Sequence, residues 1–217
     1  MPSRERGRGR CLAELPRTSR YLATLPAGLA SYPDCVLKAT YVRAAQDSLP
    51  DGITAQDFPF ELQALLYHSP SDGDWVSEVH MVALMHAMND LVFEAEDDML
   101  TWAEDGMVRM IEESPFRGFI AMTPPERFPR SLQWVWKNLR EGSSAQVVHE
   151  EPGRVRGRFE YPAHMFDEFY TRVIASGFMA PMRISRAVNP RTTVSDWCPT
   201  SFELTVEYDG AGSADGE

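Results

Sequence analysis

Apolar residues in the first two thirds of the chain recur at helical spacing. Four apolar positions three or four residues apart predict a helix over residues 58–67. The segment 75–95 is apolar nearly all round, which is typical of a buried central helix, and Asp74 is placed to be its N-cap. Further helices are predicted over residues 33–48, 99–113, 116–122 and 128–140.

At Gly142 the period changes from helical to alternating. Apolar and basic side chains alternate over residues 154–161, which predicts a strand with three arginines facing solvent. A helix is predicted over residues 166–176, with Gly177 as its C-terminal cap. Further strands are predicted over residues 145–150, over 182–188 with a bent extension over 192–197, and over 202–208. The sequence therefore predicts an α+β fold in which a helical N-terminal half packs on a C-terminal β-β-α-β-β antiparallel sheet.

The ends of the chain differ in composition from the part between them. Residues 1–20 contain six arginines against Glu5 and Glu14, which predicts a flexible basic arm. Residues 209–217 are rich in small and acidic residues and are expected to form a disordered tail. Residues 21–208 are then a single α+β domain, a size that suits the total of 217 residues.

Charge and cysteine content narrow the classes of function. The net charge of −11 argues against nucleic-acid binding, because phosphate contacts need a basic face. Three cysteines without a Cys-x-x-Cys spacing predict neither a disulfide framework nor a zinc site, and favour the cytoplasm. No stretch approaches the roughly 18 apolar residues that a membrane-spanning helix needs, so we expect no membrane partner.

The order of elements resembles a superfamily of small-molecule domains, the heme-NO-binding and V4R (vinyl-4-reductase-type) domains. The likeness is closest to a group of paralogous myxobacterial proteins within that superfamily. It is carried by Gly177 and by the stretches Ser114–Arg117, Glu151–Arg156 leading into Phe159, and Trp197–Pro199. The resemblance implies a sensory or regulatory module that binds a small molecule.

The chain departs from the heme-binding members of this superfamily at one motif. They hold the heme propionates with a Tyr-x-Ser-x-Arg motif, which is absent from this sequence. The Cys198-Pro199 dipeptide occurs in heme-responsive motifs, but a small buried cysteine beside Trp197 explains it equally well. His80 and His86 lie six residues apart, about 120° around a helix, which is poor geometry for a shared metal. The sequence therefore disfavours heme and predicts no metal site.

A non-catalytic binding module is the function that the sequence favours, because no pair of a nucleophile and a base is visible. We expect a cavity between the helices and the apolar sheet face that takes a small apolar ligand. The predicted ligand-binding residues are Met85, His86, Trp136, Phe159 and Tyr161.

The alternative is a protein-interaction or scaffold protein that uses an acidic patch and the basic N-terminal arm. Its partner would be another protein or a second copy in a homodimer. Trp134 and Trp136 point about 200° apart on a helix, so only one of them can enter the core. The predicted partner-binding residues are Glu94, Glu96, Asp97, Asp98 and Trp134.

Overall fold

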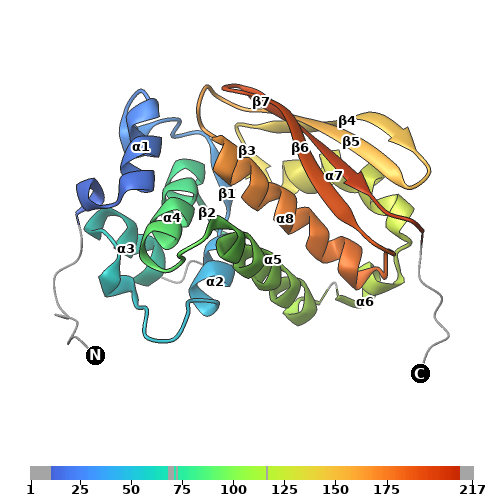
Figure 1. Ribbon diagram of the computed structural model, residues 1–217, viewed down its shortest axis with the longest axis horizontal. Helices are drawn as coiled ribbons and strands as arrows, with labels where there is room; N and C mark the ends of the chain where they lie inside the picture. The colour runs from blue at the N-terminus through green and yellow to red at the C-terminus, as the bar shows by residue number, and fades with distance from the viewer. Residues whose placement is uncertain (1–10, 68–70, 72, 116, 211–217) are drawn as a thin grey trace.

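The computed structural model describes residues 11–67, 71, 73–115 and 117–210 and shows helices packed around one face of an antiparallel sheet (Figure 1). The helices are α1 Pro16–Thr24, α2 Thr40–Asp47, α3 Phe60–Tyr67, α4 Glu78–Leu91, α5 Glu96–Glu113, α6 Arg117–Met122, α7 Phe128–Leu139 and α8 Glu168–Ile184. The strands are β1 Val36–Lys38, β2 Trp75–Ser77, β3 Arg140–Glu141, β4 Ser144–Glu151, β5 Arg154–Glu160, β6 Arg191–Cys198 and β7 Ser201–Glu207. The predicted α+β class and the β-β-α-β-β order are confirmed.

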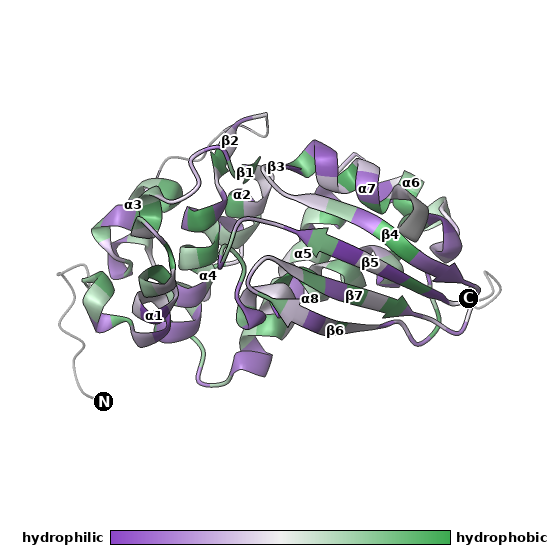
Figure 2. Ribbon diagram, turned by 90° about the horizontal axis from the view of Figure 1, so that it is seen from above, coloured by the Kyte–Doolittle hydropathy of each residue, from purple (hydrophilic) through white to green (hydrophobic). Residues whose placement is uncertain are grey.

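The larger sheet has the order β4-β5-β7-β6, with every neighbouring pair antiparallel (Figure 2). Its inner face packs against α7 and α8. The ring centroid of Phe159 lies 4.8 Å from that of Trp136 in α7 and 5.9 Å from that of Phe178 in α8. The outer face is polar, as the alternation in β5 predicts. There Arg156 and Arg158 form ion pairs with Glu203 of β7 at 3.4 and 3.6 Å.

A second, small sheet with the order β2-β1-β3 was not predicted. Leu37 at its centre pairs with Val76 of β2 and with Arg140 of β3. These strands are two or three residues long, too short for an alternating pattern to be visible in the sequence. The helix predicted over residues 33–48 is therefore wrong in its first part, since β1 occupies residues 36–38.

The central helix α4 is confirmed as a buried helix, and eleven of its residues are buried. It begins later than predicted, because residues 75–77 form β2. The N-cap is Ser77 and not Asp74, since the backbone N–H of His80 donates to the Ser77 hydroxyl at 3.4 Å.

The helix α8 runs to Ile184, past the end predicted at Gly177, so the strand predicted over residues 182–188 is wrong. The long helix α5 lies alongside α8 (Figure 1). Ion pairs join the two helices along their length, from Arg172 to Glu96 and from Arg183 to Glu104. Tertiary packing thus overrides the local preference of glycine to end a helix.

The N-terminal prediction needs correction over residues 11–20. Helix α1 begins at Pro16, and Leu15 and Thr18 are buried. The Asp90 carboxylate accepts hydrogen bonds from the backbone N–H groups of Arg17 and Thr18 at 3.0–3.2 Å, which ties α1 to the end of α4. These residues therefore belong to the folded domain. The arm over residues 1–10 and the tail over residues 211–217 lie outside the described residues.

Candidate functional site

A buried ion pair lies where the helical half meets the large sheet. Glu78 is the first residue of α4, and its backbone N–H donates to the Cys35 carbonyl at 3.0 Å. Arg140 lies in β3, on the other side of β1. The small sheet thus brings the two side chains together, and Nη1 of Arg140 donates to Oε1 of Glu78. The Glu78 residue is fully buried and Arg140 is 6% exposed.

Aromatic side chains surround this ion pair. The Arg140 guanidinium lies 4.6 Å from the ring centroid of Trp136 and 5.3 Å from that of Tyr41, both within cation–π range. The Tyr170 hydroxyl donates to Oε1 of Glu78 at 3.2 Å. Burial and the nearby Glu78 carboxylate raise the pKa of Tyr170, so this hydroxyl keeps its proton. Burial alone would lower the pKa of Arg140, but the Glu78 carboxylate raises it above its ordinary value.

His86 lies further along α4 and contacts the start of α8. Its ring stacks on Tyr21 at 5.0 Å and lies 4.7 Å from the ring of Phe169. Its Nε2 lies 3.0 Å from Oδ2 of Asp167, which is also the N-cap of α8. Burial alone would raise the pKa of Asp167, but the interaction with His86 holds it below its ordinary value. The carboxylate therefore stays ionised beside the imidazole.

Several buried polar atoms of α4 have no hydrogen-bond partner among the described residues. They are Oε2 of Glu78, Nδ1 of His80, both ring nitrogens of His86, and both side-chain polar atoms of Asn89. Glu78, His86 and Asn89 are at most 4% exposed. Because buried polar groups in proteins are nearly always paired, these atoms mark a place where a partner is expected.

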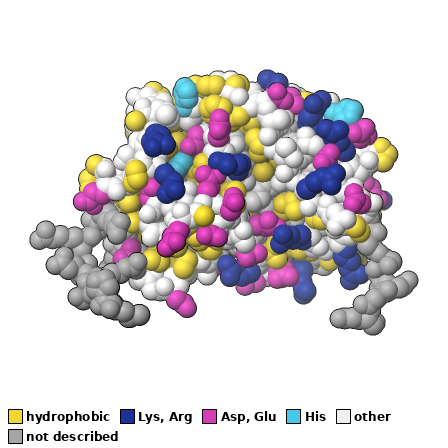
Figure 3. Space-filling view, viewed as in Figure 1, with side chains coloured by type: hydrophobic (Ala, Val, Ile, Leu, Met, Phe, Trp, Pro, Cys, Tyr) yellow, Lys and Arg dark blue, Asp and Glu magenta, His cyan; other side chains and the backbone are white. Residues whose placement is uncertain are grey.

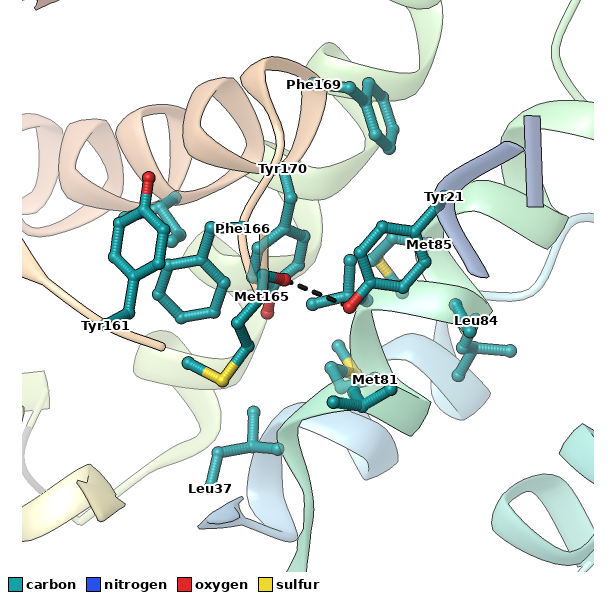
Figure 4. Close-up of a cluster of buried hydrophobic side chains, with 14 of the residues drawn as sticks. Tyr21, Leu37, Met81, Leu84, Met85, Tyr161, Met165, Phe166, Phe169 and Tyr170 are labelled. Atoms are coloured by element: carbon teal, nitrogen blue, oxygen red, sulfur yellow. Dashed lines mark hydrogen bonds between the residues drawn. The ribbon is translucent and has the colours of Figure 1, made fainter. Parts of the chain in front are cut away.

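Aromatic and methionine side chains form a buried cluster (Figure 4), in which Tyr21 and Phe169 contact the His86 ring and Tyr170 contacts Glu78. Tyr21 from α1 faces Met85 from α4, and its hydroxyl donates to the Met165 carbonyl at 3.0 Å. Phe166 and Tyr170 cover the other side, with their ring centroids 5.2 Å apart. We call this cluster, together with Glu78, Arg140 and His86, the junction.

The structure divides the predicted ligand-binding residues into two groups. Trp136, Phe159 and Tyr161 share one aromatic cluster under the sheet, while Met85 and His86 lie in the junction. Met85 belongs to the same continuous hydrophobic core as Trp136, Phe159 and Tyr161.

Among the described residues, aromatic side chains from α7, α8 and the sheet pack ring against ring between the helices and the sheet, where a cavity was expected. Tyr161 instead borders an open surface depression of about 460 Å³ beside Gly142 and Ser143. A second open depression, of about 450 Å³, lies between the end of α2 and the first half of α5 and includes Asp98.

The predicted partner-binding residues remain at the surface, with one exception. Glu94, Asp97 and Asp98 are exposed, but Glu96 is half-buried in its ion pair with Arg172. Figure 3 shows acidic and basic side chains interspersed on the visible face, so the acidic residues there do not form a uniform field. Trp134 is 69% exposed and Trp136 is 5% exposed, as their spacing requires.

Sequence reasoning missed Glu78, Arg140 and Tyr170. A charged residue inside the apolar segment 75–95 was the available signal for Glu78. Nothing in the sequence places Arg140 beside it, because their contact depends on the small sheet.

None of the described helices is long and apolar enough to cross a bilayer.

The fold is similar to that of H-NOX proteins of known structure. An Fe(II) unliganded H-NOX protein from K. algicida has a TM-score of 0.52 at 11% identity, over 83% of this chain and 100% of that chain. A Cs H-NOX mutant that contains 4-cyano-L-phenylalanine has a TM-score of 0.54 at 6% identity, over 80% of this chain and 97% of that chain. An H-NOX structure obtained to probe heme distortion has a TM-score of 0.53 at 6% identity, over 82% and 96% of the two chains.

These likenesses show the fold and confirm the heme-NO-binding part of the resemblance at that level. The closer resemblance to V4R domains and to the myxobacterial proteins stays a prediction. No protein-family model matches the sequence, and no curated protein sequence matches it.

Heme is the cofactor that the likeness to H-NOX structures brings into question. The junction does not fit it. The ring of His86 is held between Tyr21 and Phe169, and its Nε2 faces Asp167. A macrocycle there would have to displace Tyr21, Phe169 and the methionines around them. The junction as packed in this structure therefore does not fit a heme.

Proposed function

We propose that the chain is a non-catalytic sensory module that binds a small molecule other than heme. The ligand lies in the junction between α4 and α8, beside Glu78 and His86. The observation that carries this proposal is the set of buried, unpartnered polar atoms on α4, since a bound ligand would supply the missing hydrogen bonds. The H-NOX-like fold supports it, because the folds of sensory domains place their ligands between packed elements.

The junction is suited to signalling because it joins the two halves of the domain. Glu78 and His86 belong to α4, while Asp167 is the N-cap of α8 and Tyr170 belongs to α8 itself. A ligand that binds between them changes the contacts of both helices at once. Such a change biases the relative position of two rigid elements, which is the physical basis of a sensor.

The cellular setting belongs to the proposal as well. The three cysteines are free, which suits the reducing cytoplasm. A protein partner or a second copy would bind the domain differently in its ligand-bound and ligand-free states. Trp134 is the exposed aromatic side chain that we assign to that contact. The pure scaffold function has less support, because Glu96 of the acidic patch is already paired within the chain.

Native mass spectrometry of the full chain, purified from its own host without denaturation, tests the proposal. We expect a small molecule that stays bound in gentle conditions and leaves on unfolding. The variant His86→Phe keeps the ring stacking on Tyr21 and Phe169 but removes the imidazole nitrogens, and should lose the ligand.

Trp134→Ser is the matched control, because this side chain is 69% exposed and takes no part in the core, and it should keep the ligand. Absence of any bound molecule, together with no thermal stabilisation by fractions of the host's small-molecule extract, would contradict the proposed function.

A further inference from the structure

The segment that carries α6, the short 3₁₀ helix Pro125–Arg127 and α7 differs in charge from the rest of the chain. Residues 117–139 contain four basic residues and one acidic residue, whereas the whole chain has a net charge of −11. The basic side chains of Arg117, Arg127 and Lys137 are exposed. None of the three forms an ion pair with another residue that the structure describes. Positive charge is therefore concentrated on one part of an acidic molecule, where a partner can reach it.

Large apolar side chains are exposed on the same two helices. Phe119 and Met122 of α6 and Trp134 of α7 are each at least 68% exposed. Trp134 and Lys137 are three residues apart and so lie on the same side of α7. Figures 1 and 2 both place α6 beside the beginning of α7. The name α6–α7 surface is used below for the exposed side chains of Arg117, Phe119, Met122, Arg127, Trp134 and Lys137.

A depression of the opposite charge lies between the end of α2 and the first half of α5. Its volume is about 450 Å³, a size at which proteins bind small molecules and therefore ample for one indole ring. Leu49, Pro50 and Trp102 form its apolar wall. The indole N–H of Trp102 donates to the Ser48 carbonyl at 2.7 Å, which fixes the ring. The charged residues that line the depression are Asp47, Asp51, Asp98, Asp105 and Arg109.

This depression is the complement of the α6–α7 surface, because it combines an apolar wall with a net negative charge. None of its four aspartates forms an ion pair among the described residues. The exposed aromatic side chain and the basic side chains of the α6–α7 surface are the groups that such a depression attracts.

The two surfaces are too far apart to meet within one copy. Along α5, Asp98 and Glu113 are separated by about 23 Å, and α6 begins only after Glu113. Figure 1 shows α2 in the left half of the molecule and α6 and α7 in the right half. A contact between them therefore joins two copies. Because it uses different surfaces on the two copies, it is heterologous and gives an open chain or a closed ring.

We propose that the α6–α7 surface of one copy binds the depression between α2 and α5 of a second copy. Trp134 lies against the apolar wall formed by Leu49 and Trp102, and the basic side chains of α6 and α7 face the aspartates. The opposite charges speed the encounter, and the indole that becomes buried supplies affinity. This inference rests on the partner contact proposed above, since it names the partner as a second copy and adds the surface that receives Trp134.

Sedimentation velocity of the full chain at rising concentration tests the contact. We expect assemblies larger than a dimer at low salt. Raising the ionic strength from about 0.1 M to about 1 M shortens the Debye length from about 10 Å to about 3 Å, so the contact should weaken at least about tenfold.

Two double variants separate the two sides of the contact. Trp134→Ser/Lys137→Ser changes only the α6–α7 surface, and Asp98→Lys/Asp105→Lys changes only the depression. Each variant alone should be monomeric where the unmodified chain assembles. An equimolar mixture should form a heterodimer and nothing larger, because one variant keeps the depression and the other keeps the α6–α7 surface. The control Phe60→Ser removes an exposed aromatic side chain of α3 and should assemble like the unmodified chain.

A chain that stays monomeric at every concentration would overturn the inference, while native mass spectrometry decides ligand binding separately. If the mixture does not recover the heterodimer, although Trp134→Ser/Lys137→Ser abolishes assembly, the contact is a symmetric one between two α6–α7 surfaces and the inference is wrong. Binding of a monomeric chain to vesicles of phosphatidylserine and phosphatidylcholine, lost in Trp134→Ser, would assign the α6–α7 surface to a membrane instead.

Discussion

The variant Arg140→Met tests the central electrostatic feature of the junction. Methionine has a similar length and no charge, so it removes the guanidinium while it keeps much of the packing against Trp136. The Glu78 carboxylate then stays buried with Tyr170 as its one remaining donor among the described residues. Breaking a buried ion pair on one side costs about 3–5 kcal/mol, because an uncompensated charge remains in the core. This cost is a large part of the roughly 5–15 kcal/mol by which typical domains are stable.

Urea unfolding followed by tryptophan fluorescence measures this loss. For a chain of this size, a loss of about 3–5 kcal/mol in the free energy of unfolding corresponds to a melting temperature lower by about 6–20 °C. The double variant Glu78→Leu/Arg140→Met removes both charges and should be more stable than the single variant. Arg156→Met, on the open sheet face, is the control and should change stability by less than about 0.5 kcal/mol. A loss below about 1 kcal/mol for Arg140→Met, or a double variant less stable than the single one, would refute the electrostatic argument.

Three further predictions concern other parts of the molecule. Because the pKa of Asp167 is lowered by its histidine partner, Asp167→Asn should cost about 1–2 kcal/mol at neutral pH. The difference from the unmodified chain should begin to shrink in urea melts below about pH 4 and vanish only once the pH has passed the lowered pKa of Asp167. The Cys198 thiol has a pKa of about 7 because Ser201 and the neighbouring turn hydrogen-bond to it, so its alkylation, followed by mass spectrometry, should rise with a midpoint near that pH. Ser201→Ala should move that midpoint upward, and an unchanged pH profile would contradict the assigned cause. Trp136→Ala should cost about 3–5 kcal/mol in a thermal melt, whereas Trp134→Ala should cost less than about 0.5 kcal/mol; similar losses for both would mean that the burial of this helix is misassigned.

The elements that could be predicted from the sequence are those whose burial repeats with a regular period. The strand β5 alternates strictly, and the helix α4 is apolar all round, so each pattern indicated the right structure. The spacing of Trp134 and Trp136 alone required that one be exposed, and the structure confirms this.

The elements that escaped prediction depend on contacts between distant parts of the chain. The strand β1 is three residues long, and its two partners come from residues 75–77 and 140–141. The continuation of α8 beyond Gly177 depends on α5, which no local pattern reveals. The same holds for the candidate site. Met85 and His86 could be predicted as ligand-binding residues from the pattern of the helix that carries them, whereas Arg140 reaches the junction only through the small sheet.

The small sheet also determines how the chain can be divided. Glu78 and Arg140 are 62 residues apart in sequence, and a cut between α6 and α7, after Thr123, would separate them. Each fragment would carry one charge without its counterpart, and β1 would lose the strand β3 at its edge. We expect neither fragment to fold alone, but each fragment carries the charged side chain and the strands that the other fragment needs. The domain should therefore work as a split protein, whose two pieces regain their structure only when they are brought together.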